Sequence, residues 1–229
     1  VVLDSLKKRS DTGFDLLRCR DFQQMAGRAG RRGMDKEGFA YLRINPRHVA
    51  HHEIVHLING KPESVHSRFN PAYATLLNLY RRYGPDLLEL FPQTLYYFQT
   101  SGQRRQEGLE LMQRKLDLLN SSGYLSPKAL TEKGMFASWL YGYELLLTEL
   151  YTEGYLADLD PNALAILMTA IVYEPRPRTP SARPHSLSKR LTHICQQPLA
   201  NIHKAEKHFR ISPRTKAPAF HLSHAMDAW

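Results

Sequence analysis

The ten residues from Gln24 to Gly33 combine the residue types that bind phosphate groups. The glycines are Gly27, Gly30 and Gly33, and the arginines are Arg28, Arg31 and Arg32. Glycine lets the backbone bend and approach a ligand closely, and each guanidinium presents a planar fork of N–H donors that fits phosphate oxygens. The stretch predicts either a phosphate-binding loop or a basic turn that meets only solvent or an acidic neighbour.

Arg28 and Arg31 have a spacing that could direct two guanidinium groups at one anion. We expect a helix over residues 19–28, and residues three apart lie on one side of a helix end. Two guanidiniums on one phosphoryl group would stabilise the charge that develops during its transfer, as an arginine finger does.

A piece of α/β architecture is expected around this loop. The opening residues "VVLDSL" are β-branched and apolar, as in a buried strand, and "GFAYLRI" from Gly38 to Ile44 predicts a second strand. A strand, a helix with a glycine-rich turn and another strand are too few for a complete α/β domain.

Helices are expected over most of the remaining chain, which makes the fold class mostly α. One helix would begin with Asn70 as N-cap and Pro71 as first residue, and another with Asp160 and Pro161. A longer amphipathic helix is expected across residues 109–119. In the helix that begins at Asp160, an apolar stripe predicts a core-facing side that comprises Leu164, Leu167, Met168, Ile171 and Val172.

Two further segments bear on nucleic-acid binding. Helices joined by tight Gly/Pro turns and followed by a small hairpin at 121–134 suggest a winged helix. A basic helical segment is expected from Leu187 to Phe209, interrupted at Pro198. Its polar side is either a solvated face or a face that contacts nucleic acid. The residues on it are Lys189, Arg190, His193, His203, Lys204, Lys207 and His208.

Composition limits the classes of function. The chain has 229 residues and a net charge of +9, which suits a polyanionic partner such as nucleic acid but is also common in ordinary solvated domains. Cys19 and Cys195 lie far apart without neighbouring ligands, so we expect no disulfide and no metal site. The absence of a long apolar run and of a signal peptide predicts a cytoplasmic protein with no membrane partner.

A short match to a zinc motif has two interpretations. The sequence from His52 to His56 fits H-E-x-x-H, in which two histidines bind zinc and a glutamate acts as general base. No third ligand is evident downstream, so a connecting helix is the preferred interpretation.

The sequence "QMAGRAGRRG", from Gln24 to Gly33, resembles motif VI of superfamily 2 helicases in the form used by superkiller-type DExH-box helicases, which include the exosome-associated RNA helicases. The flanks are also similar to this family. "VVLDSLKKRSDTGFDLLRCRDF" resembles the stretch before motif VI, "INGKPESVHSRFNPAYATLLNLY" the entry to the winged helix, and "ELLLTELYTEGYLADLDPNALAILMTAIVYEPR" and "PAFHLSHAMDAW" the C-terminal helical domain.

The resemblance implies three parts. Residues 1–45 would end the second RecA-like domain, residues 46–142 would form a connector and a winged helix, and residues 143–229 would begin the C-terminal helical (DSHCT-like) bundle. Helices of that bundle in the family include a ratchet helix that holds the 3′ portion of a single strand.

The resemblance also implies roles for motif residues. Gln24 would couple the ATP site to the nucleic-acid side. Arg28 and Arg31 would contact the γ-phosphate, with Arg31 as the arginine finger, while Gly27 and Gly30 would permit close approach.

Departures from the family pattern limit what this chain could do alone. Nothing in it resembles a Walker A loop or a DExH box, so ATP and Mg²⁺ would be bound mainly by a missing N-terminal part. No long arch insertion lies between Phe98 and Gln106, which suggests a compact, bacterial-type member.

The expected function is that of the C-terminal portion of an ATP-dependent 3′ to 5′ RNA helicase, inactive by itself. Its expected partners are single-stranded RNA and RNA-degradation machinery. The alternatives are a DNA-unwinding helicase of the same family and a noncatalytic nucleic-acid-binding or assembly module.

Overall fold

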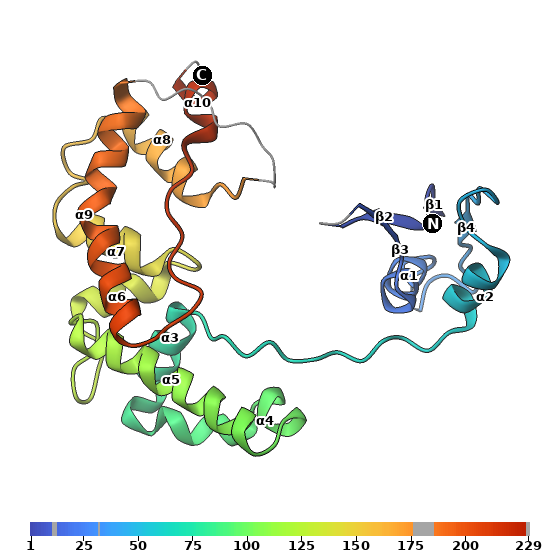
Figure 1. Cartoon of the computed structure of the whole chain (residues 1–229), viewed down its shortest axis with the longest axis horizontal. Helices are drawn as coiled ribbons and strands as arrows, with labels where there is room; N and C mark the ends of the chain where they lie inside the picture. Colours follow the sequence, from blue (N-terminus) through green and yellow to red (C-terminus); the bar gives the residue numbers. More distant parts are fainter. Residues whose placement is uncertain (11–12, 32, 176–185, 228–229) are drawn as a thin grey trace. The chain divides into compact units, whose positions relative to one another are not determined.

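The computed structural model describes residues 1–10, 13–31, 33–175 and 186–227 (Figure 1). Arg32, one of the three arginines of the loop, therefore lies outside the described residues. The chain divides into two compact units, residues 1–66 and 67–229. None of the described helices combines the length and the hydropathy needed to cross a bilayer.

The first unit contains a parallel strand pair and two helices. Its elements are β1 (Val2–Leu3), β2 (Lys7–Arg9), β3 (Phe14–Leu16), α1 (Cys19–Ala26), β4 (Tyr41–Leu42) and α2 (His51–Asn59). β1 pairs in parallel with β4, and such a pair needs a crossover connection, here the segment that carries α1. The expected strand, helix and strand are thus confirmed. The antiparallel β2–β3 hairpin was not predicted.

A small core holds the first unit together. Leu3 and Leu6 from β1 and the turn after it pack with Phe22 of α1 and Leu57 of α2. The two helices therefore share one apolar cluster with the strand that precedes the loop.

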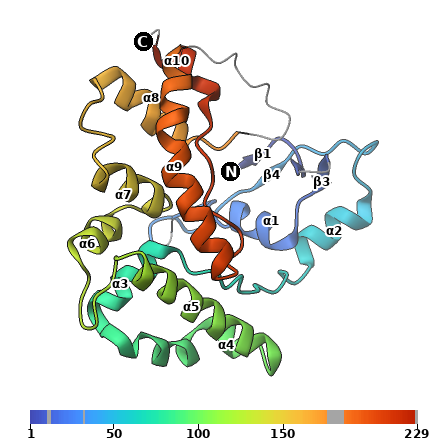
Figure 2. The same ribbon diagram turned by 60° about the vertical axis from the view of Figure 1, so that its left-hand side comes forward.

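The second unit is helical, which confirms the mostly α fold class. Its elements are α3 (Tyr73–Tyr83), the 3₁₀-helix η1 (Gly84–Gln93), α4 (Leu95–Gln99), α5 (Gln103–Ser121), α6 (Glu132–Trp139), α7 (Glu144–Thr152), α8 (Pro161–Val172), α9 (Ser186–His208), the 3₁₀-helix η2 (Phe220–Leu222) and α10 (Ser223–Asp227). Figure 2 shows the long helix α9 beside α7 and α8, both of which it contacts. The predicted helix across 109–119 is confirmed as part of α5.

One continuous apolar core joins these helices. It includes fully buried leucines from α3, α5, α7, α8 and α9, namely Leu76, Leu77, Leu119, Leu150, Leu167 and Leu191. The predicted boundary between a winged helix and a helical bundle falls inside this core, and the division into three parts stays a prediction.

The predicted start of α3 is wrong, while that of α8 is confirmed. The N-cap of α3 is Ala72, and the Asn70 Oδ1 instead accepts a hydrogen bond from Lys115 Nζ at 2.7 Å. The carboxylate of Glu144 accepts a hydrogen bond from the N–H of Ala74 at 2.9 Å and thereby caps the N-terminus of α3. Asp160 caps α8 as expected, since its Oδ1 accepts from the N–H of Ala163 at 2.9 Å.

Two details of the helical expectations need correction. In α8, Leu167 and Ile171 are buried, but Leu164 and Val172 are 36% and 54% exposed because they lie off the core-facing side. The break expected at Pro198 is absent, since α9 is continuous through it. Pro198 is buried in the helix, so packing compensates for the backbone hydrogen bond that proline cannot donate.

The hairpin expected at 121–134 is reduced to one antiparallel bridge, between Leu125 and Leu130. It connects α5 to α6, with the cap of α6 supplied by Thr131, whose Oγ1 accepts from the N–H of Gly134 at 3.1 Å.

Buried charged side chains satisfy backbone groups in the second unit. Glu206, only 1% exposed, accepts hydrogen bonds from Tyr73 Oη at 3.2 Å and from Thr215 N–H and Oγ1 at 2.9 Å and 2.7 Å. Lys115 Nζ donates to Pro71 O at 2.7 Å. These contacts fasten the segment after α9 and the segment before α3 to the helical core.

The replacement Glu206→Ala should lower the free energy of unfolding by about 2 kcal/mol, because buried donors on Tyr73 and Thr215 would lose their acceptor. Urea unfolding monitored by circular dichroism measures this. The matched control Lys207→Ala, at an exposed neighbouring position, should change stability by less than about 0.5 kcal/mol. Equal effects of the two replacements would contradict the role of Glu206.

Lys115 predicts a specific pH dependence of stability. Burial lowers the pKa of its ammonium from 10.5 to about 8, so between these values the unfolded chain binds more protons than the folded one. The wild-type free energy of unfolding should therefore rise with pH across this window relative to a Lys115→Met variant. With about 1.4 kcal/mol for each pKa unit and partial solvent screening, the rise should be on the order of 2 kcal/mol. A flat or falling difference in urea titrations from pH 8 upward would refute this.

Candidate functional site

Helix α1 carries the start of the candidate loop and is held firmly on the residues that follow α2. The carboxylate of Glu63 accepts hydrogen bonds from the N–H groups of Cys19 and Arg20, each at 2.9 Å. These bonds, chiefly the one from Arg20, lower the pKa of Glu63. A Cβ atom on Gly60 would lie 2.7 Å from Cys19 Sγ, so only glycine allows this approach. The N-terminal end of α1 is therefore fixed before the loop begins.

The helix ends earlier than expected, so Arg28 and Arg31 do not lie on a helical face. The last helical residue is Ala26, and the N–H of Gly27 donates to Gln23 O at 2.8 Å. The N–H of Ala29 then donates to Ala26 O at 2.9 Å, which tightens the chain into a turn. Glycine has low helix propensity, and Gly27 explains why the predicted helix over 19–28 stops two residues early, at Ala26.

The loop that carries the two arginines is closed by contact between backbones. Gly30 has φ +81°, a conformation that L side chains rarely adopt. A Cβ atom on Gly38 would lie 2.1 Å from Ala29 O. The beginning and the end of the loop therefore touch through glycine backbone, and the described residues between Gly30 and Gly38 are exposed.

Arg31 is anchored by an acidic neighbour. Its N–H and Nε both donate to Asp35 Oδ2, at 2.7 Å and 3.3 Å, and its side chain remains 71% exposed. These bonds lower the pKa of the Asp35 carboxyl group. This is the acidic neighbour foreseen for a basic turn, but a single exposed ion pair contributes little to stability. Sequence reasoning missed Asp35, although its spacing of four from Arg31 was a usable signal.

Gln24 and Arg28 are exposed, as are Gly27 and Gly30. Within the described part of the chain, the side chains of Gln24 and Arg28 have no hydrogen-bond or ion-pair partner. The structure thus brings the predicted residues onto one short surface segment from the last turn of α1 to the loop after it, with one guanidinium anchored and one unengaged.

The H-E-x-x-H match lies on α2, where Glu53 has a structural role. Its Oε2 accepts from the N–H of Ala50 at 2.7 Å and closes the N-terminus of the helix. Among the described residues, no three His, Cys, Asp or Glu side chains are grouped so as to hold a metal ion.

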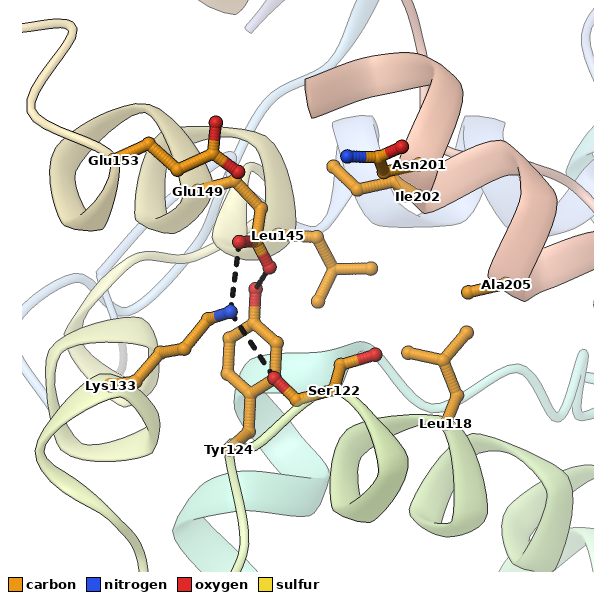
Figure 3. A pocket seen from close by; sticks show the side chains of 10 residues that line it. All are labelled: Leu118, Ser122, Tyr124, Lys133, Leu145, Glu149, Glu153, Asn201, Ile202 and Ala205. Atoms are coloured by element: carbon orange, nitrogen blue, oxygen red, sulfur yellow. Dashed lines mark hydrogen bonds and ion pairs between the residues drawn. The ribbon is translucent and has the colours of Figure 1, made fainter. Parts of the chain in front are cut away.

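A polar pocket of about 190 Å³ lies in the second unit, between the α5–α6 connection, α7 and α9 (Figure 3). In it, Glu149 accepts hydrogen bonds from Tyr124 Oη at 2.6 Å and from Lys133 Nζ at 2.8 Å. Burial, followed by the charge of Glu149, raises the pKa of Tyr124, so its hydroxyl stays protonated. The three side chains satisfy one another and fasten the α5–α6 connection to α7.

The C-terminal part of the chain is similar to a known domain and to known helicases. Residues 128–229 match the sequence model of the DSHCT (NUC185) domain. Human "Superkiller complex protein 2" is 38% identical over 81 residues, which cover 35% of this chain and 6% of that protein. The chain is therefore similar to superkiller-type DExH-box helicases.

Two further helicases are similar to this chain at the same level. The Arabidopsis thaliana "DExH-box ATP-dependent RNA helicase DExH9" is 31% identical over 99 residues, 43% of this chain and 10% of that protein. The Mycobacterium tuberculosis "Probable helicase HelY" is 35% identical over 85 residues, 37% of this chain and 9% of that protein. The chain thus matches only about a tenth or less of the length of these relatives.

The replacement Gly38→Ala should open the arginine loop, because its Cβ would collide with Ala29 O. We expect trypsin to cleave after Arg28 and Arg31 markedly faster in this variant than in the wild type. Glu37→Ala, at the exposed preceding residue, is the matched control and should leave the rate unchanged. Equal cleavage rates in the Gly38→Ala variant and in the wild type would show that the contact does not close the loop.

Proposed function

We propose that this chain is the C-terminal portion of an ATP-dependent RNA helicase and that its arginine loop completes an ATP site built mainly by another part of the protein. The observation that carries the proposal is the exposed pair Arg28 and Arg31 on a glycine loop closed against Gly38. The similarity to superkiller-type helicases and the DSHCT match support it.

The residues of the loop fit the phosphate end of a nucleotide. Arg31 would act as the finger that stabilises charge on the transferring phosphoryl group, and Arg28 would contact the γ-phosphate beside it. Asp35 would orient Arg31 through the bond to Nε, which leaves the two terminal nitrogens to face the phosphate. Gln24, one turn earlier, would transmit occupancy of the ATP site to the nucleic-acid side.

Binding of Mg²⁺ and of the rest of ATP is assigned to a part of the protein other than the described residues. Those residues offer no cluster of carboxylates or histidines for a cation, and the sequence has no Walker A loop or DExH box. We therefore expect the 229-residue chain to hydrolyse no ATP by itself.

The finer division of the fold belongs to the same proposal. The parallel β1–β4 pair with α1 in the connection is compatible with the end of a RecA-like domain. Helices α3 to α6 with the bridge at Leu125 would form the winged helix, and the helices after it would begin the bundle that holds a single strand.

RNA is the proposed substrate, with unwinding from 3′ to 5′, and RNA-degradation machinery in the cytoplasm is the proposed partner. The names of the plant relative, an RNA helicase, and of the human relative, a protein of the superkiller complex, support this choice. Unwinding of DNA is the alternative within the family.

A noncatalytic nucleic-acid-binding module is the second candidate, favoured by the basic side of α9. Its cationic side chains Lys189, Arg190, Lys204 and Lys207 are exposed. This candidate predicts nucleotide-independent binding to single strands whose affinity falls steeply with salt.

In the natural full-length protein, Arg31→Ala should abolish ATP hydrolysis and leave ATP affinity nearly unchanged, because the finger acts mostly in the transition state. A loss of at least about a thousandfold in kcat is expected from the size of arginine-finger effects. Hydrolysis rates measured with saturating ATP, together with titration of a fluorescent ATP analogue, separate the two effects.

The matched control is Arg20→Ala, which removes an arginine of α1 that pairs with Asp21 rather than facing the loop. It should hydrolyse ATP at close to the normal rate. Normal ATP hydrolysis by the Arg31→Ala protein would contradict the assignment of Arg31 as the arginine finger.

A further inference from the structure

A groove in the second unit lies between α5 and the residues that follow α9. Two adjacent hollows, of about 370 Å³ and 330 Å³, are both lined by Arg114 of α5 and by Arg210. Figures 1 and 2 both show the C-terminal end of α9 next to α5. The two arginines, about a hundred residues apart in sequence, therefore define one continuous site, here named the Arg114–Arg210 groove.

Neither guanidinium in this groove is neutralised by the described residues. The Nε of Arg114 is buried and has no hydrogen-bond partner among them. Glu107 and Glu110 also line the hollows, but each accepts a hydrogen bond from a glutamine at 3.0 Å, and no ion pair joins either of them to an arginine of the groove within the described residues. A buried N–H without an acceptor is costly, and no carboxylate of the described chain compensates the charge of this guanidinium, whose side chain lines both hollows. An anion from outside the chain could do so.

Arg210 is kept in a backbone conformation that normally selects glycine. Its φ is +53°, in the left-handed region. Its N–H donates to Lys207 O at 3.1 Å, and the N–H of Ile211 donates to Glu206 O at 2.8 Å. This is the hydrogen-bond pattern of a helix end whose left-handed position is usually glycine. An arginine at such a position points to a function for its side chain.

An aromatic wall adjoins the guanidiniums. The rings of Phe69 and Tyr96 are stacked with centroids 5.1 Å apart, and both residues line the smaller hollow. Gly108 on α5 permits this wall, because a Cβ there would lie 2.6 Å from Tyr96 Cε1. A flat apolar surface beside cationic groups is the arrangement that binds single strands by stacking and charge.

We propose that the Arg114–Arg210 groove binds a phosphodiester group of a single-stranded nucleic acid, with both guanidiniums on one phosphate and the adjoining sugar and base against the aromatic wall. The proposal rests on the proposed action of this chain on nucleic acid. It goes beyond it by assigning a strand-binding site that is separate from the arginine loop and needs no nucleotide.

The test is the salt dependence of binding of a short oligouridylate to the full 229-residue chain without nucleotide, measured by fluorescence anisotropy. Each phosphate contact adds about 0.7 to the slope of log K against log salt for single strands. Arg114→Gln and Arg210→Gln should each weaken binding, and the double variant should reduce the slope by roughly that amount and no more, because both arginines hold the same phosphate.

Two control variants separate the site from general charge and from folding. Arg82→Gln removes an exposed arginine of α3 and should leave the slope unchanged. Arg210→Gly removes the guanidinium but relieves the left-handed backbone, so it should bind as weakly as Arg210→Gln while its melting temperature is equal to or higher than that of the wild type.

The proposal is overturned if the Arg114 and Arg210 variants match Arg82→Gln in affinity and slope. It is also overturned if inorganic phosphate at matched ionic strength displaces the strand completely from the wild type, which would indicate a free-anion site, or if polyglutamate competes better than the strand. Hydrolysis of ATP by the Arg31→Ala protein reports on the arginine loop alone, so failure of either proposal can be recognised separately.

Discussion

The arginine loop depends on one contact between two stretches of backbone, the approach of Gly38 to the carbonyl group of Ala29. A side chain at position 38 would place its Cβ 2.1 Å from that oxygen, which no packed structure tolerates. The contact joins the turn after α1 to the segment that leads into β4, and β4 in turn pairs with β1. The geometry of the proposed phosphate site is therefore set by the absence of a side chain rather than by a strong attraction.

Buried charged groups have the corresponding role in the second unit. Glu144 completes the N-terminus of α3, and Glu206 holds the segment after α9 through Thr215. Each carboxylate accepts hydrogen bonds from groups that would otherwise lack a partner inside the protein. In contrast, the guanidinium nitrogen of Arg114 lacks such a partner among the described residues, which is why this site and not the buried carboxylates suggests an external ligand.

The sequence predicted those features that depend on neighbouring residues. The strand, helix and strand around the loop, the helix α5 and the Asp160 cap follow from local spacing and were confirmed. The start of α3 was mispredicted because its cap comes from Glu144, distant in sequence, and the continuity of α9 at Pro198 depends on packing around that residue. The arginine loop was found through its composition and its family resemblance, but neither could show that Arg28 is free and that Arg31 is held by Asp35. The Arg114–Arg210 groove could not be predicted from the sequence, because its two arginines come together only in the folded chain.

The central claim, that the arginine loop serves an RNA-dependent ATPase, is tested most directly by ATP hydrolysis of the natural full-length protein. Single-stranded RNA and single-stranded DNA of identical sequence would be added in parallel, with a sample lacking nucleic acid as reference. The account predicts hydrolysis that RNA stimulates and DNA does not. Stimulation by DNA alone would contradict the choice of RNA, and no hydrolysis under any of the three conditions would contradict the helicase function itself.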